Sequence, residues 1–175
     1  MIRLVVVLTT ICAISSALLA AVYNLTKEPI AVALEQRTLR AAANVMPAGL
    51  SAPEKIVVED TEFFVCRQDG ERVAVAVKGV SRNGYGGVIE MMVGMSMDRK
   101  LVNFEVVSAA ETPGLGTKIA GDAFRKPMMG MPLASRWFVR KEGGDVDAVT
   151  AATISSRAAL ECIRDAIAKL VLLEE

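Results

Sequence analysis

The sequence predicts an α+β protein in which a single N-terminal transmembrane helix precedes a domain made of an antiparallel sheet flanked by helices. Three observations predict this class. Residues 4–23 form an apolar run without a charged side chain. The middle of the chain holds short β-type runs separated by tight-turn residues, which favours antiparallel over parallel pairing. The C-terminal segment repeats apolar residues at helical spacing.

Composition excludes several classes of function. The chain has 175 residues, 20 Lys and Arg against 20 Asp and Glu, no His, and three widely separated Cys. A net charge of zero argues against a nucleic-acid partner, because duplex binding usually needs a basic excess. A chain without His supplies no Ser-His-Asp triad and no His ligand for zinc or haem. With no C-x-x-C spacing among the Cys either, we expect no metal site, so that redox chemistry would need an organic cofactor or a partner.

The apolar run at residues 4–23 is long enough to span a membrane. At ~1.5 Å per residue it covers about 30 Å, the thickness of the hydrocarbon core of a bilayer. A signal peptide cleaved near Ser15-Ser16-Ala17 is the alternative interpretation. The run continues through Val22, however, which favours a retained anchor.

The charges that flank this run predict its orientation. Arg3 and the amino terminus precede the run, whereas Lys27 and Glu28 after it cancel each other. Because positive flanks stay in the cytoplasm, we expect a cytoplasmic N-terminus and a single pass through the cytoplasmic (inner) membrane. The predicted organisation is a membrane anchor over residues 1–28 and an extracytoplasmic domain over residues 29–175.

A second helix is predicted directly after the anchor. Pro29 suits the first turn of a helix, and apolar residues follow at helical spacing as far as Val45. Pro47-Ala48-Gly49 ends this helix, and residues 50–54 are expected to form a loop.

The predicted sheet rests on runs of apolar residues and on the turns between them. Asp69-Gly70 is a hairpin signal, and Asp98-Arg99-Lys100 forms another turn. The predicted strands are Phe63–Val65, Val73–Val77, Val88–Met97, Leu101–Ser108 and Arg136–Arg140.

A packing helix is predicted at the C-terminal end. Arg157 and Glu161, like Asp165 and Lys169, are four residues apart and are expected to pair on the water-facing side. The opposite, apolar face consists of Ala159, Ile163, Ala166, Ile167 and Leu170.

The segment just before that helix, Asp147–Ser156, is dense in hydroxyls and small residues. One interpretation is helix capping, in which a Ser or Thr oxygen accepts a bond from a free backbone N–H. The other is phosphate binding, because the N-terminal end of a helix offers unpaired N–H groups and the positive end of its dipole.

Two further clusters precede it. Glu111–Lys118 carries two glycines around a leucine, which permits a ligand to approach the backbone closely, and otherwise is a surface loop. Asn83–Gly87 either links two strands or presents the Tyr85 ring to a planar ligand.

Together, and in this order after the anchor, these clusters resemble one family over nearly the whole chain. The chain is similar to the G subunits of the Rnf ion-translocating ferredoxin:NAD oxidoreductases (RnfG) and to the related NqrC subunits of the sodium-pumping quinone reductases. The family motif Asp-x-x-Ser/Thr-Gly-Ala-Thr matches Asp147, Thr150 and Thr153 at its first, fourth and last positions. The chain departs from the motif at Ala151, where the family has Gly.

The resemblance implies an FMN-binding domain in which a flavin transferase joins FMN to Thr153 through a phosphoester. The ring system of the flavin would then lie against the loops at 84–87 and 111–118. If position 151 requires a positive φ, Ala151 is strained there. The cofactor-binding residues implied are Gly84, Tyr85, Gly86, Glu111, Thr112, Leu115, Gly116, Thr117, Lys118, Asp147, Thr150, Ala151, Ala152 and Thr153.

The resemblance also implies a function. The chain would be a membrane-anchored electron-transfer subunit of a redox-driven Na⁺ or H⁺ translocase, with no complete active site of its own. The implied partners are the multi-spanning membrane subunits and, through the complex, the ferredoxin- and NAD-binding subunits. The alternatives are an NqrC-like subunit, a stand-alone extracytoplasmic flavinylated carrier, and a non-redox anchored scaffold whose Thr-rich turn only caps a helix.

Overall fold

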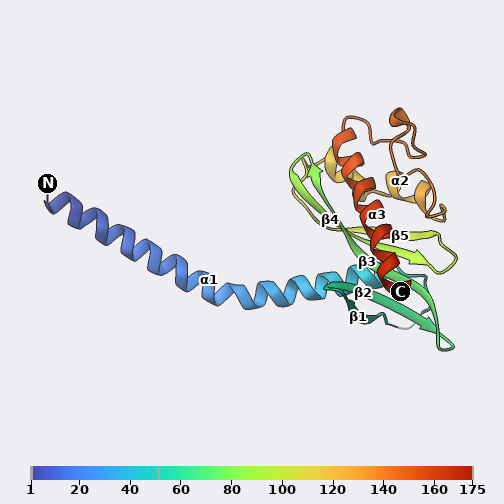
Figure 1. Cartoon of the computed structure of the whole chain (residues 1–175). Helices are drawn as coiled ribbons and strands as arrows, with labels where there is room; N and C mark the ends of the chain where they lie inside the picture. The colour runs from blue at the N-terminus through green and yellow to red at the C-terminus, as the bar shows by residue number, and fades with distance from the viewer. Residues whose placement is uncertain (1, 51, 175) are drawn as a thin grey trace. The chain divides into compact units, whose positions relative to one another are not determined.

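The computed structural model describes residues 2–50 and 52–174 (Figure 1). The chain separates into two units, Met1–Arg37 and Thr38–Glu175. The long helix α1 (Ile2–Asn44) begins in the first unit and ends in the second. Each unit is described by itself.

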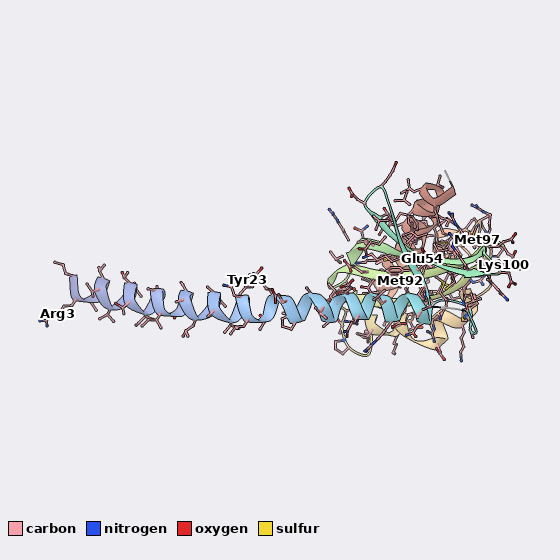
Figure 2. The ribbon with its side chains drawn as sticks, turned by 90° about the horizontal axis from the view of Figure 1, so that it is seen from below. Arg3, Tyr23, Glu54, Met92, Met97 and Lys100 are labelled. Atoms are coloured by element: carbon pink, nitrogen blue, oxygen red, sulfur yellow. The ribbon has the colours of Figure 1, made fainter. Side chains whose placement is uncertain are left out.

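The first unit is a helix without a core of its own. All side chains of residues 2–37 are exposed, and the helix is long and apolar enough to cross a membrane. Two of its hydroxyls bond back to the helix: Thr10 Oγ1 donates to the Val6 carbonyl at 2.8 Å and Thr26 Oγ1 to the Val22 carbonyl at 2.9 Å. Figure 2 shows Arg3 at the free end of this helix and Tyr23 farther along it. The hydroxyl groups of Thr10 and Thr26 therefore have hydrogen-bond partners without water, as a membrane interior requires.

The prediction that a new helix begins at Pro29 is wrong, because Pro29 lies inside the continuous helix α1. A proline inside a helix lacks the N–H that would bond to the carbonyl four residues earlier, here that of Leu25. The helix formers on both sides keep the other bonds, so the break predicted from proline alone does not occur.

The second unit contains the predicted antiparallel sheet. Five strands follow one another in the order β1-β2-β3-β4-β5, each antiparallel to the next. Asp69 and Gly70, with φ of 53° and 87°, make the predicted hairpin turn between β2 and β3. The strands are β1 (Glu54–Val58), β2 (Thr61–Gln68), β3 (Glu71–Gly84), β4 (Gly87–Ser96) and β5 (Leu101–Ala109).

Two predictions about the strands need correction. Strand β1 has no counterpart among the predicted strands, and its first residue, Glu54, falls in the predicted loop 50–54; Ser51 of that loop lies outside the described residues. Residues 136–140 make no strand of the sheet and form only one isolated bridge, between Val139 and Val146. The apolar residues Trp137 and Val139 are buried because this loop packs on the core.

Short helical turns fill the segment between the sheet and the last helix. They contribute Ile119, Phe124 and Met128 to the core. These turns are η1 (Gly116–Ala120), α2 (Asp122–Arg125), η2 (Lys126–Met128) and η3 (Arg140–Glu142).

Both faces of the sheet are covered. On β3, Val75 and Val77 point to the larger core, whereas Ala74 and Ala76 point to a smaller cluster beneath the end of α1. The small alanine side chains leave room for Ala41 and Ala42 of that helix. Because neighbouring strand residues face opposite sides and both sides are buried, the middle of β3 is a continuous apolar run.

Helix α3 (Thr153–Glu174) covers the larger core. Figure 1 shows α3, in red, crossing the sheet, where it contacts β3 and β4. Its predicted apolar face is confirmed, since Ala159, Ile163 and Ala166 are fully buried. Helix α3 begins at Thr153. Because the helix is packed on the sheet, the position of the hydroxyl-rich segment at its start is fixed as well.

The two predicted charge pairs on α3 turn out differently. Lys169 Nζ lies 2.6 Å from Asp165, as expected. Arg157 and Glu161 do not pair with each other: Glu161 accepts hydrogen bonds from Ser81 Oγ at 2.6 Å and from Asn83 Nδ2 at 2.8 Å. The carboxyl of Glu161 thus ties α3 to β3 just before the β3–β4 hairpin.

This tie makes the stability of the domain depend on pH. The hydrogen bonds from Ser81 and Asn83 lower the pKa of Glu161 in the folded chain. Ionised Glu161 therefore stabilises the fold above its unfolded-state pKa, and this stabilisation is lost as the pH falls through the folded-state pKa. At about pH 7, Glu161→Gln should lower the free energy of unfolding by about 1 kcal/mol, since the group is partly exposed.

Urea unfolding of the detergent-solubilised chain at several pH values measures this difference. It should narrow as the pH falls from about 5 to 3. Glu71→Gln, on an exposed residue at the start of β3, is the control and should show no comparable difference. A gap between wild type and Glu161→Gln that stays constant over the whole range would contradict the assignment.

Candidate functional site

The three clusters singled out in the sequence meet around one cavity of about 490 Å³. They arrive from the β3–β4 hairpin, from the loop that follows β5, and from the first turn of α3. Such a volume is ordinary for a pocket that holds a small organic ligand. The cavity is lined by Tyr85, Glu111, Thr112, Leu115, Gly116, Ala151, Ala152, Thr153, Ile154 and Ser155.

One carboxyl group joins the three segments. Glu111, only 5 % exposed, accepts a hydrogen bond from the Gly86 N–H at 3.2 Å through Oε1. Its Oε2 accepts a hydrogen bond from Ser155 Oγ at 2.6 Å. A buried carboxyl group is costly unless it is hydrogen-bonded, so these contacts are needed for the loop to close on the hairpin and the helix.

Close packing around this carboxyl explains the second glycine of the Glu111–Lys118 cluster. A Cβ added to Gly116 would overlap Glu111 Oε2 and Ser155 Oγ. Gly116 itself is buried and begins η1. A side chain at this position would therefore push apart the pair that holds the base of the cavity.

The hydroxyls at the start of α3 have different roles. Ser155 is committed to Glu111, and Ser156 Oγ accepts the Val149 N–H at 2.9 Å while donating to the Ala152 carbonyl at 3.0 Å. Within the described residues, the Thr153 hydroxyl has no hydrogen-bond partner, although Thr153 lines the cavity. Ser156 therefore ties the turn that precedes α3 to the helix, and the Thr153 oxygen takes part in none of these bonds.

The backbone around Thr153 suits an anion. Thr153 is the first residue of a 22-residue helix, and the first N–H groups of a helix have no carbonyl one turn earlier to bond to. The residue before the helix is Ala152, whose side chain has no acceptor for these groups. Unpaired N–H groups and the helix dipole at this end of α3 both favour a negative charge beside Thr153.

Ala151 has a left-handed backbone, with φ of 62°. The sequence left open whether this position needs a positive φ, and the structure shows that it does. An L-residue with a Cβ pays about 1 kcal/mol or more for this conformation, which glycine adopts freely. The turn into α3 thus keeps the shape that glycine would favour, at the cost of local strain.

The rim of the cavity is apolar and exposed. Tyr85 is 69 % exposed, Ile154 45 % and Leu115 42 %. These three side chains offer flat and branched apolar surface next to the Thr153 hydroxyl, which is the environment that a planar aromatic ring prefers.

The other residues in the predicted site lie outside this cavity. Asp147, Thr150 and Lys118 line a neighbouring cavity of about 480 Å³, and Asp147 pairs with Arg140 at 2.8 Å. Gly84 and Thr117 line neither cavity; Thr117 Oγ1 accepts the Gly114 N–H at 3.0 Å, while Gly84 pairs with Gly87 in the hairpin. Gly86 acts through its N–H to Glu111.

Sequence reasoning did not assign Ile154 and Ser155 to the site. The signal for Ile154 was its place on α3, since a large apolar residue off the buried face has no core to pack against. Ser155 gave no separate signal, because its partner Glu111 is 44 residues away in the sequence.

The described part of the second unit offers neither a metal centre nor an exposed thiol. Residues 2–50 and 52–174 hold no group of three or more His, Cys, Asp or Glu placed to bind a metal ion. Cys66 and Cys162 are both buried, and burial raises the pKa of the Cys162 thiol to about 12. Such a thiol is protonated at neutral pH and is a poor nucleophile.

Comparison with known proteins agrees with this geometry. Residues 84–168, which include all but the first residue of the three clusters, match the FMN-binding domain family. In structure, the chain is similar to the C subunit of the Na⁺-translocating NADH-quinone reductase of Parabacteroides distasonis, with a TM-score of 0.50 and 19 % identity over 66 % of this chain and 63 % of that one. At this identity the likeness supports the fold alone, and it confirms the predicted α+β class.

Two relatives are similar over most of their length. The G subunit of the ion-translocating oxidoreductase complex of Vibrio atlanticus is 31 % identical, with 92 % of this chain and 86 % of the relative aligned. The G subunit of the proton-translocating ferredoxin:NAD(+) oxidoreductase complex of Clostridium ljungdahlii is also 31 % identical, over 91 % and 86 %. The resemblance inferred from the motifs is thereby confirmed. The chain belongs to the family of G subunits of ion-translocating oxidoreductase complexes.

Proposed function

We propose that this chain is the membrane-anchored, FMN-carrying electron-transfer subunit of an Rnf-type ion-translocating ferredoxin:NAD oxidoreductase. The observation that carries the proposal is the cavity within the FMN-binding match, where three distant segments surround a hydroxyl with no partner among the described residues. Relatives aligned over most of their length are subunits of such complexes. The chain would pass electrons between the redox centres of a translocase that moves Na⁺ or H⁺.

Thr153 is the proposed attachment point for FMN. In the transfer, Thr153 Oγ forms a bond to the phosphorus of the flavin, and the bond from that phosphorus to the leaving group of an activated flavin phosphoanhydride breaks. The hydroxyl proton goes to solvent, and a flavin transferase catalyses the step. Thr153 is half-buried at the mouth of the cavity, which keeps its oxygen within reach of such an enzyme.

The other residues hold the cofactor rather than react. The first N–H groups of α3 would hold the phosphate, and Tyr85, Leu115 and Ile154 would offer apolar surface to the ring system. Glu111 positions the hairpin and the helix through Gly86 and Ser155. When bound, FMN supplies one-electron redox chemistry, with a potential that the surrounding charges and hydrogen bonds tune.

Two alternatives are less well supported. An NqrC-like subunit is disfavoured because the relatives at 31 % identity are G subunits, whereas the likeness to the C subunit of the quinone reductase is one of fold. A non-redox scaffold whose Thr-rich turn only caps a helix is disfavoured because, among the described residues, the Thr153 hydroxyl makes no capping bond and lines the cavity instead. A stand-alone carrier differs from a complex subunit in its partners: only the latter should co-purify with multi-spanning membrane subunits.

The N-terminal helix is proposed as the anchor. Residues 1–28 would hold the chain in the cytoplasmic membrane with Arg3 inside, and residues 29–175 would lie outside the cytoplasm. The support is the length and apolarity of α1 and the flanking charges.

The attachment site can be tested by substitution of Thr153. Thr153→Val keeps the shape of the side chain but removes the oxygen, so the flavin fluorescence that survives denaturing electrophoresis should disappear completely. Thr61→Val makes the same change on strand β2, outside the three clusters, so it is the control and should keep the fluorescent band. Intact-mass spectrometry should show one FMN adduct in the wild type and in this control. A fluorescent band from Thr153→Val would contradict the assignment of Thr153 as the attachment point.

The strain at Ala151 generates a second prediction. Ala151→Gly should raise the free energy of unfolding by about 0.5–1 kcal/mol, because relief of the positive φ outweighs the added entropy of the unfolded chain. Ala52→Gly, an exposed loop position without a positive φ, should instead lower it by a similar amount. Urea unfolding of both variants measures the difference, and a loss of stability in Ala151→Gly would refute the strain.

The orientation can be tested by chemical labelling. Glu71→Cys places a thiol on an exposed position of β3, whereas Cys66 and Cys162 are buried and Cys12 lies in the proposed anchor. A membrane-impermeant maleimide should label this variant in intact spheroplasts, and the wild type should stay unlabelled. Labelling only in inverted vesicles would place the domain in the cytoplasm.

A further inference from the structure

A second cavity, of about 330 Å³, adjoins the proposed flavin site and has no role in the function described so far. Ile154 lines both cavities, so they meet at the first turn of α3. The second cavity is distinguished by its charged side chains, which are Glu142, Arg157, Glu161 and Arg164.

Two of these four charges are held by contacts within the fold. Glu161 is bound by Ser81 and Asn83. Arg164 donates to the Trp137 carbonyl at 2.5 Å and lies over the Phe138 ring, 4.2 Å from its centre. Its place on α3, eleven residues after Thr153, also puts it about 16 Å farther along the helix axis.

Arg157 differs from Arg164 both in its distance from Thr153 and in how firmly its charge is held. It is four residues after Thr153, so its side chain lies on nearly the same face of α3 and about 6 Å along the axis. Its partner is Glu142, at 2.5 Å, and both side chains are partly exposed. An ion pair exposed in this way contributes little stability, so exchanging it costs little.

We propose that Arg157 is a positioning residue that binds the phosphodiester linking FMN to Thr153 and exchanges Glu142 for it. This inference rests on the proposed function, because it requires the phosphodiester at Thr153. The planar guanidinium group of an arginine can donate two parallel hydrogen bonds to two phosphate oxygens. This interaction is stronger than an ion pair between an arginine and a carboxylate that are both exposed to solvent. With its phosphate end held by Arg157 and by the start of α3, the flavin would have less freedom to move on its single tether.

The competing cation is Lys118, which lines the cavity on the other side of the site. Three variants of the full-length flavinylated chain separate the two: Arg157→Gln, Arg157→Lys and the control Lys118→Gln. The measurements are the ³¹P resonance of the phosphodiester and the fluorescence anisotropy of the tethered flavin, which do not depend on electron transfer. In Arg157→Gln the resonance should shift towards that of a free dialkyl phosphate and the anisotropy should fall. Arg157→Lys should restore part of both, and Lys118→Gln should leave both unchanged.

A second comparison covers the case in which Arg157→Gln is poorly flavinylated. Glu142→Gln removes the competing partner of Arg157 without touching the attachment site, so added salt should shift the ³¹P resonance less in this variant than in the wild type. A salt dependence equal to that of the wild type, or a response to Lys118→Gln as large as that to Arg157→Gln, would overturn the role of Arg157.

A double-mutant cycle, measured by melting temperature, gives a third and independent test. The Arg157→Gln change should lower the melting temperature more in the flavinylated chain than in the Thr153→Val background, where Arg157 has only Glu142 to lose. Equal losses in the two backgrounds would contradict the proposal. A wild-type chain of unmodified mass would instead refute attachment at Thr153, so failure of this inference and failure of the proposed function are distinguishable.

Discussion

The site depends on one buried carboxyl group. Glu111 is fixed by the Gly86 N–H on one side and by the Ser155 hydroxyl on the other, and these partners come from a hairpin and a helix that are far apart in the sequence. Because Glu111 is only 5 % exposed, leaving its carboxyl group without hydrogen bonds would be costly, so these contacts favour the arrangement in which the three segments meet. The sheet and α3 bring the three segments close together, and the hydrogen bonds of Glu111 fix their arrangement.

Local patterns predicted the elements whose cause is local. The Asp69-Gly70 turn, the strands on both sides of residues 98–100 and the apolar face of α3 follow from residue spacing alone. Residues 136–140 were mistaken for a strand because Trp137 and Val139 alternate as strand residues do, although they alternate to meet the core from a loop. Strand β1, at the edge of the sheet, was missed although Ile56, Val57 and Val58 are β-branched residues of the kind that favours strands.

The site was predictable in its parts but not in its arrangement. The motifs indicated which segments form the site. Residue spacing does not show, however, which of their side chains line the cavity and which are occupied by hydrogen bonds. Of the hydroxyls at the start of α3, Ser155 and Ser156 are consumed by hydrogen bonds that depend on Glu111 and Val149, which leaves Thr153. Asp147 and Lys118 line a separate cavity, although the motif places Asp147 only six residues before Thr153.

The contrast between the base and the rim of the cavity has a consequence for how such proteins diversify. At the base, Glu111, Gly116 and Ser155 contact one another so closely that almost any replacement disturbs all three. At the rim, Tyr85, Leu115 and Ile154 are largely exposed, and replacing exposed residues of this kind usually costs little stability. Selection can therefore retune the electronic surroundings of a bound ring by exchanging rim side chains, one at a time, while the architecture that holds it stays untouched.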